Sequence, residues 1–320
     1  MVLLKVVSAI KRVPEDVQMR LQTRFPGAMF VFCHGMGEAE DFLEEADVFI
    51  TYGEDLDAEK IKIAKKLKWI MVLSAGMDQM PFIEISKRDI LVTNVRGIHA
   101  QPMAEYAISM LLQVSRKAKT LQGQEQNEEW NRRPVANEIS GRTMVLLGTG
   151  AIPQEVARLA KAFQMKTIGI SKSGRTRPNF DEVHPVQQID LVLPGADFIV
   201  AALPSTPDTK HMLAADQFRR MPKHSIFLNM GRGDLVSSEI ILDAVRGGEI
   251  DHAVLDVFEE EPLPAGHPLW KEEKVTITPH MSGISPQYVS RGFALFEENM
   301  EVFLSVEGTL QNIIDPKRGY

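Results

Sequence analysis

The stretch that decides the fold is Arg142-Thr-Met-Val-Leu-Leu-Gly-Thr-Gly-Ala-Ile-Pro153, which continues as Gln154-Glu-Val-Ala-Arg-Leu-Ala-Lys-Ala-Phe163. An apolar run ends in two glycines and is followed by apolar residues at helical spacing, which predicts a buried strand, a tight turn and a helix. The backbone N–H groups that open such a helix have no partner within it, and the helix dipole adds positive charge there. The stretch therefore predicts a binding site for the phosphates of a dinucleotide.

Each residue of this turn has its own predicted task. Gly148 takes the backbone conformation of the turn, and Gly150 lets the chain approach a pyrophosphate, while Ala151 and Ile152 open the helix. Pro153 stands where a third glycine is usual, and proline suits a first helical turn because it has no N–H to leave unpaired. A plain strand–helix turn without a ligand is the alternative interpretation.

Composition limits the classes of protein to which this turn can belong. The 320 residues are 44% hydrophobic and 25% charged, which is typical of a soluble chain with about two domains. A net charge of −7 argues against a general nucleic-acid or anionic-membrane surface. The single cysteine, Cys33, excludes an internal disulfide and a multi-cysteine zinc site, so we expect no metal and a reducing, cytoplasmic compartment. The opening segment 1–7 is too short to span a membrane.

The first part of the chain alternates apolar runs with amphipathic stretches, which predicts a parallel sheet covered by helices. The expected strands are 2–7, 29–32, 48–51, 69–73 and 90–93. One helix is expected to begin at Pro14, and another is expected over 59–67. Ser74-Ala-Gly-Met-Asp78 follows the fourth strand, at the sheet edge where ligands bind in such folds. A plain turn is the alternative interpretation of this loop.

A polar, charged segment over 122–137 predicts a surface connection or an arm. It follows a long apolar helix that begins near Pro102, so the second domain is expected to start near Gln101. Trp130 is the only large apolar residue of the segment; we prefer local packing for it and keep a subunit contact as the alternative.

A second alternating series predicts strands at 144–147, 166–170, 197–201, 225–228, 253–255 and 275–278, the strand count of a Rossmann unit. After its second strand, where an acid normally binds the adenosine ribose, the chain reads Ser171-Lys-Ser-Gly-Arg-Thr-Arg177. Hydroxyls and cations there suit a 2′-phosphate, so Ser171, Lys172, Ser173 and Arg175 predict a preference for NADP(H), with NAD(H) still open. A basic surface loop is the alternative.

Three further stretches end strands on the same sheet edge. They bring Arg232, then Asp256 with Glu261, and then His280, which follows a proline. An arginine, an acid and a histidine beside a nicotinamide cofactor form a site that can bind an anion and move a proton during hydride transfer.

With these motifs the chain resembles the D-isomer-specific 2-hydroxyacid dehydrogenases. The resemblance rests on Leu147-Gly-Thr-Gly-Ala-Ile152, Ala202-Leu-Pro-Ser-Thr-Pro-Asp-Thr209, Leu228-Asn-Met-Gly-Arg-Gly233, Leu255-Asp-Val-Phe-Glu-Glu-Glu-Pro262 and Thr278-Pro-His-Met-Ser-Gly283. It implies an α/β protein with two Rossmann-like, doubly wound parallel-sheet domains and a cleft between them. Residues 1–100 and 285–320 would form a flavodoxin-like substrate domain, residues 101–284 the dinucleotide domain, and two copies a homodimer. The final helix, expected over 286–306, would cross back to the first domain.

The resemblance also assigns roles to single residues. Arg232 would bind the substrate carboxylate, His280 would protonate the keto oxygen, and Glu261 would hold the imidazole in its charged form. Asp256 would meet the nicotinamide amide. The backbone of Ala75, Gly76 and Met77 would take the substrate carboxylate from the other domain, with Tyr52 beside the substrate side chain. Further cofactor contacts would come from Met103, Leu203, Pro204, Thr209, Met230, Gly231 and Gly283.

The sequence thus predicts an oxidoreductase that transfers a hydride between NADP(H) and a small 2-keto or D-2-hydroxy acid of the glyoxylate, hydroxypyruvate or pyruvate type. The alternative is a dinucleotide-sensing, corepressor-like binding protein of the same fold. The sequence leaves open which keto acid is the substrate and how Pro153 affects cofactor affinity.

Overall fold

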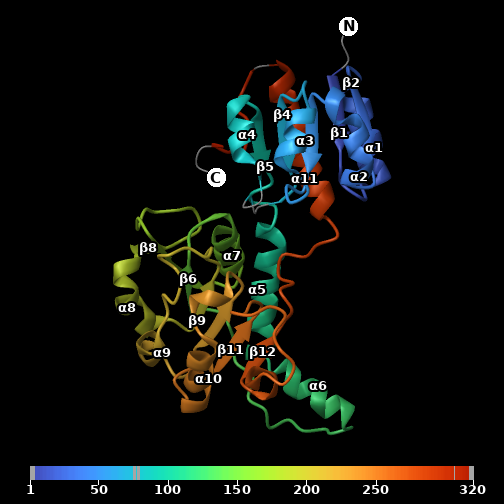
Figure 1. The fold of residues 1–320 in the computed structure, drawn as a ribbon. Coiled ribbons are helices and arrows are strands. Elements are labelled where there is room, and N and C mark those ends of the chain that lie inside the picture. The colour runs from blue at the N-terminus through green and yellow to red at the C-terminus, as the bar shows by residue number, and fades with distance from the viewer. Residues whose placement is uncertain (1–3, 75–76, 78–79, 306, 317–320) are drawn as a thin grey trace. The chain divides into compact units, whose positions relative to one another are not determined.

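Two compact units make up the structure. The computed structural model describes residues 4–74, 77, 80–305 and 307–316. Met1–Ile98 with Ser285–Tyr320 form the first unit, and His99–Ile284 form the second. Each unit is built on one parallel sheet with helices on its faces, so the predicted α/β fold with two parallel-sheet domains is confirmed (Figure 1).

The first unit contains a five-stranded sheet in the order β2-β1-β3-β4-β5, the strand order of flavodoxin-like folds. Each strand overlaps the range predicted for it. The strands are β1 (Leu4–Ser8), β2 (Ala28–Phe32), β3 (Val48–Thr51), β4 (Trp69–Val72) and β5 (Leu91–Asn94).

Helices cover both faces of this sheet because the strands between its edges are apolar on both sides. One face packs against α1 (Glu15–Arg24) and α11 (Tyr288–Ser305), and the other against α2 (Met36–Ala39), the 3₁₀ helix η1 (Glu40–Glu45), α3 (Ala58–Ile63) and α4 (Phe82–Lys87). In α11, Phe296 is fully buried and stacks on Trp69 with ring centroids 5.0 Å apart. The prediction that the final helix packs on the first unit is therefore confirmed.

The predicted helix over 59–67 is shorter than expected. Asp57 caps the start of α3 by accepting a hydrogen bond from the N–H of Lys60 at 2.9 Å. The guanidinium of Arg88 binds the carbonyl oxygens of Ala64 and Lys65, at 2.8 and 2.9 Å, beyond the end of the helix. These bonds satisfy carbonyls that a continuing helix would otherwise use.

The second unit contains a sheet in the order β12-β11-β10-β9-β6-β7-β8, which has seven strands in the described part of the chain where six were expected. The extra strand, β8, lies at one edge beside β7. The strands are β6 (Thr143–Leu147), β7 (Lys166–Ser171), β8 (Glu182–Pro185), β9 (Phe198–Ala201), β10 (Ile226–Asn229), β11 (His252–Leu255) and β12 (Val275–Ile277).

Two layers of helices enclose this second sheet. Its faces pack into separate apolar clusters, one with α5 (Ala100–Ser115) and α7 (Ala151–Ala162), the other with α8 (Ile189–Val192), α9 (Ala215–Arg220) and α10 (Ser238–Gly247). Short 3₁₀ turns lie at Val186–Gln188, Leu193–Gly195, Gly233–Leu235 and Pro268–Lys271. The chain order reverses between β6 and β9, the crevice in which such sheets bind ligands.

One segment extends away from this second unit. Helix α6 (Ala118–Gln126) and the chain after it project from the end of α5 (Figure 1), and no residue of α6, all of which are described, is buried. Trp130 is 94% exposed. The local packing that we preferred for Trp130 is therefore wrong.

Among the residues that the structure describes, no helix combines the length and the apolar character that crossing a membrane requires.

Candidate active site

The glycine turn after β6 has the predicted form. Gly148 has a φ of +107°, a conformation that favours glycine, and it packs beside the carbonyl of Ala202. Gly150 has open space where a side chain would be, and no described side chain caps the start of α7. Pro153 is buried in the first turn of that helix. The helix N-terminus is therefore accessible to an anion, and its geometry fits a pyrophosphate.

Two more glycines bring the neighbouring loops into contact. A Cβ on Gly231 would lie 2.7 Å from the backbone of Leu203, and a Cβ on Gly233 would lie 1.9 Å from the carbonyl carbon of Phe258. A side chain at either position would clash with backbone atoms of the neighbouring loop. The loops that follow β9, β10 and β11 are thus in direct backbone contact, with Arg232 between the two glycines.

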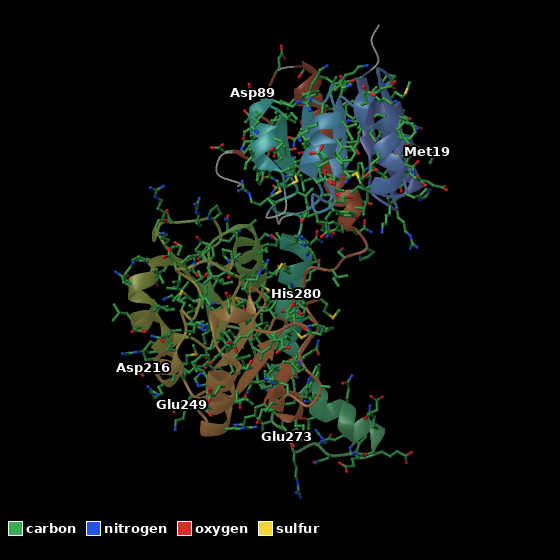
Figure 2. The ribbon with its side chains drawn as sticks, viewed as in Figure 1. Met19, Asp89, Asp216, Glu249, Glu273 and His280 are labelled. Carbon is green, nitrogen blue, oxygen red and sulfur yellow. The ribbon has the colours of Figure 1, made fainter. Side chains whose placement is uncertain are left out.

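His280 and Glu261 form a hydrogen-bonded pair on this edge. Nδ1 of His280 lies 2.7 Å from Oε2 of Glu261, and Oε1 of Glu261 accepts the N–H of Phe258 at 2.9 Å. His280 has a φ of +50°, and its N–H donates to the carbonyl of Asp256 at 2.9 Å. Glu273 precedes β12 and His280 follows it, and the two are well apart in Figure 2, so His280 lies at the carboxyl edge of the sheet. The side chain is half exposed, and among the described residues Nε2 forms no hydrogen bond.

A buried network holds the loop that carries His280. The carboxylate of Asp256, which is fully buried, accepts hydrogen bonds from the hydroxyl of Thr278 at 2.5 Å and from the N–H groups of Met281 and Ser282, both at 2.9 Å. Thr278 uses its proton in this bond, so Tyr106 must donate in the 2.7 Å contact between their hydroxyls. Burial raises the pKa of Tyr106, which keeps its hydroxyl protonated. The predicted contact of Asp256 with a nicotinamide amide stays a prediction; here its carboxylate anchors a loop.

Arg232 is exposed and has an extended backbone. Its Nη1 donates to the carbonyl of Gly231 at 2.7 Å, and its own carbonyl accepts the side-chain amide of Asn229 at 2.9 Å. Among the described residues no carboxylate forms an ion pair with Arg232. Within that part of the chain its other guanidinium donors form no hydrogen bond, so they can bind an anionic ligand.

The basic loop after β7 is also exposed, as a phosphate site requires. The hydroxyl oxygens of Ser171 and Ser173 accept the N–H groups of Gly174 and Arg175, at 3.2 and 3.4 Å, which shapes the loop as tight turns. No ion pair to Arg175 occurs within the described part of the chain. Lys172, by contrast, binds the carboxylate of Asp208 at 2.8 Å.

The other predicted cofactor contacts differ in exposure. Met103 and Met230 are at most 9% exposed and belong to the core of the second unit, so a ligand would meet their backbone rather than their side chains. Leu203 is partly buried, and Pro204 is exposed with its carbonyl bound by Thr209 at 2.6 Å. The carbonyl of Gly283 lies 3.3 Å from the ring of His99.

The predicted substrate contacts of the first unit follow strands β3 and β4. Tyr52 is partly buried, which raises the pKa of its hydroxyl. The side chain of Met77 is 7% exposed and packs in the apolar core. Ala75 and Gly76 lie outside the described residues.

The sequence did not indicate the contacts that Tyr106, Thr278 and Asp208 make at the candidate site. Thr278 and Asp208 lie within the motifs quoted above, but their partners are on other strands and loops. Contacts of this kind leave no local pattern in the sequence. A metal centre would need at least three His, Cys, Asp or Glu side chains together, and no such group occurs among the described residues.

Comparison with known proteins gives a consistent result. A sequence model of the NAD binding domain of D-isomer specific 2-hydroxyacid dehydrogenases matches residues 108–282. The chain is 30% identical to the glyoxylate reductase of Korarchaeum cryptofilum over 269 residues, which cover 82% of this chain and 80% of that relative.

Solved structures agree with these sequence matches. A D-isomer specific 2-hydroxyacid dehydrogenase family protein from Aeromonas salmonicida is 31% identical, with a TM-score of 0.79 and coverage of 98% of this chain and 99% of that one. An NADPH-dependent glyoxylate/hydroxypyruvate reductase from Sinorhizobium meliloti, solved with NADP and sulfate, is 26% identical, with a TM-score of 0.77 and coverage of 99% and 100%.

Proposed function

This chain belongs to the D-isomer-specific 2-hydroxyacid dehydrogenase family, and from that premise we propose that it reduces small 2-keto acids with NADPH as its preferred cofactor. It is an oxidoreductase that acts on small 2-hydroxy or 2-keto acids with a nicotinamide dinucleotide. What we propose beyond this family activity is the direction of the reaction, the identity of the keto acid and the preference for NADPH. Glyoxylate, hydroxypyruvate and pyruvate are the substrates that we expect.

The hydrogen bond between His280 and Glu261 carries this proposal. Glu261 fixes Nδ1 of the ring at 2.7 Å, so Nε2 is the nitrogen left to exchange a proton with a ligand. In reduction the protonated ring would donate that proton to the keto oxygen as the oxygen gains negative charge. In the reverse direction the neutral ring would accept the proton of the hydroxyl group.

Arg232 supports the substrate side of the proposal. Its planar guanidinium, which has no carboxylate partner among the described residues, suits two parallel hydrogen bonds to a substrate carboxylate. The packing of Gly233 against Phe258, and the bond from Phe258 to Glu261, fix the arginine loop relative to the acid. Substrate contacts by Tyr52, Ala75, Gly76 and Met77 stay predictions, as does a closing cleft.

The turn after β6 and the loop after β7 would hold the cofactor. The open space at Gly150 and the uncapped start of α7 suit the pyrophosphate, and Ser171, Lys172, Ser173 and Arg175 suit a 2′-phosphate. The bound cofactor would supply the hydride, and the second unit would position it. The complex of the Sinorhizobium relative with NADP supports this preference.

The predicted homodimer and cytoplasmic location also stay predictions. The exposure of Trp130, on a segment that projects from the second unit, supports a contact with another copy.

A keto-acid-dependent assay of NADPH oxidation tests the proposed function directly. We expect glyoxylate, hydroxypyruvate or pyruvate to support many turnovers, with NADPH used at a higher kcat/KM than NADH. Tight dinucleotide binding without turnover of any of the three acids would instead favour the dinucleotide-sensing alternative.

A further inference from the structure

An ion pair joins two loops above the strand that carries the glycine turn. Lys172 directly follows β7, and Asp208 lies in the loop after β9, with the lysine Nζ 2.8 Å from Oδ2 of the aspartate. Because β6 lies between β7 and β9 in the sheet, the pair spans the end of β6. That position is the switch-point crevice, where a dinucleotide's adenosine would enter.

The pair changes the charge of the basic loop more than it stabilises the fold. Both side chains are mostly exposed, 88% for Lys172 and 71% for Asp208, and exposed pairs contribute little to folding. The hydrogen bond between them raises the pKa of the lysine and lowers that of the aspartate, so both are charged at neutral pH. The carboxylate therefore neutralises one of the cations assigned to the 2′-phosphate.

We propose that Asp208 lessens the preference for NADP(H) by competing with its 2′-phosphate for Lys172. This inference rests on the proposed function, because it assumes that the loop after β7 holds that phosphate. A phosphate with a charge near −2 repels the carboxylate and must draw the lysine away from it. The ribose hydroxyls of NAD(H), in contrast, are donors that a carboxylate accepts. The carboxylate of Asp208 thus weakens the binding of NADP(H) and favours the binding of NAD(H).

Asp208→Asn in the full chain tests the inference, with dissociation constants for NADPH and NADH measured at low salt. We expect NADPH to bind about two- to fivefold more tightly, the effect of one screened surface charge, while NADH binds equally or more weakly. Asp216→Asn is the matched control, because Asp216 is an exposed acid that pairs with Arg219 on α9 (Figure 2). This control changes the net charge equally and should leave both constants unchanged.

A double-mutant cycle shows whether the effect passes through Lys172. In a Lys172→Ala background, Asp208→Asn should no longer tighten NADPH to the same extent, because the competition has been removed. The inference is wrong if Asp208→Asn changes both cofactors equally, or if its effect is the same in both backgrounds.

The same variants separate this inference from the proposed cofactor site. If Lys172→Ala and Arg175→Ala weaken NADPH while Asp208→Asn leaves the NADPH to NADH ratio unchanged, the phosphate site stands and the role of Asp208 is refuted. If neither cation variant affects NADPH, the phosphate site itself is wrong, and the inference fails with it.

Discussion

Nδ1 of His280 lies 2.7 Å from Oε2 of Glu261, and the two residues come from loops that follow adjacent parallel strands, β12 and β11. The second carboxylate oxygen of Glu261 is held by the N–H of Phe258. The imidazole therefore has a fixed tautomer and orientation, as proton transfer at its other nitrogen requires. The positive φ of His280 is compatible with this reading, because strained backbone often occurs at functional sites.

Arg232→Lys should lower kcat/KM for keto acids by about 30- to 100-fold, because a single ammonium cannot replace two parallel charge-assisted bonds. Steady-state kinetics with glyoxylate and hydroxypyruvate measure this loss, and NADPH affinity should be unchanged. Arg246→Lys is the control, since Arg246 lies on α10 and pairs with Glu272. Near-normal kcat/KM in Arg232→Lys would assign this arginine a structural role.

Arg175→Ala should weaken NADPH by about one to two decades, the value of a lost charge-assisted contact, and leave NADH nearly unaffected. Cofactor titrations followed by fluorescence measure both constants. Arg158→Ala, which removes an exposed arginine paired with Glu155 on α7, controls for net charge. Equal losses for the two cofactors would remove the basis for an NADP(H) preference.

Thr278→Val should lower kcat about tenfold or more while NADPH binding holds, because small displacements of a catalytic group are costly. The change leaves the hydroxyl of Tyr106 without its acceptor and removes one donor from Asp256. Thr278→Ser restores the hydroxyl and should recover most of the rate. If serine and valine lower kcat equally, the hydroxyl network does not position the loop of His280.

His252 should make the protein less stable in acid. Burial, opposed by Asp251 and assisted by Lys117, Lys119 and Lys274, lowers the pKa of His252 from 6.5 to about 4. As the pH falls, the imidazole of the unfolded chain is protonated before that of the folded protein. The contribution of neutral His252 to the free energy of unfolding is therefore complete above pH 6.5 and is lost as the pH falls toward 4. The loss should reach about 3 kcal/mol.

Urea unfolding of the wild type and of His252→Gln across this pH range measures the effect. Glutamine can keep a hydrogen bond to Thr276, which lies 2.9 Å from the histidine ring, but it cannot titrate. The free energy of unfolding should fall more steeply in the wild type than in the variant. Parallel curves would mean that His252 has an ordinary pKa.

Most of the sheet strands could be predicted from sequence, because parallel strands buried on both faces are continuous apolar runs. β8 could not, since Glu182-Val-His-Pro185 is a short polar edge strand with no buried residue. Its pairing with β7 is set by the neighbouring strand rather than by its own composition. The exposure of Trp130 was likewise unpredictable, because a large apolar side chain looks the same in sequence whether or not the fold covers it.

The candidate site shows a similar limit. Spacing after strands correctly placed Arg232, Glu261 and His280 on one sheet edge, because the carboxyl ends of parallel strands share that edge. Spacing could not show where the Asp256 carboxylate points, which depends on side-chain rotamer and burial. Nor could it show that Asp208 pairs with Lys172, because that contact joins loops 36 residues apart.

The rate of keto-acid reduction by His280→Ala tests the central claim most directly. Loss of a general acid should lower kcat by about 10²–10⁴-fold, while the variant folds and binds NADPH as the wild type does. His224→Ala is the matched control, because His224 pairs with Asp197, 2.9 Å away, and both precede strands β10 and β9 at the sheet edge opposite the candidate site. It should retain normal turnover. Near-normal reduction by His280→Ala would contradict the account, since proton transfer would then not depend on this ring.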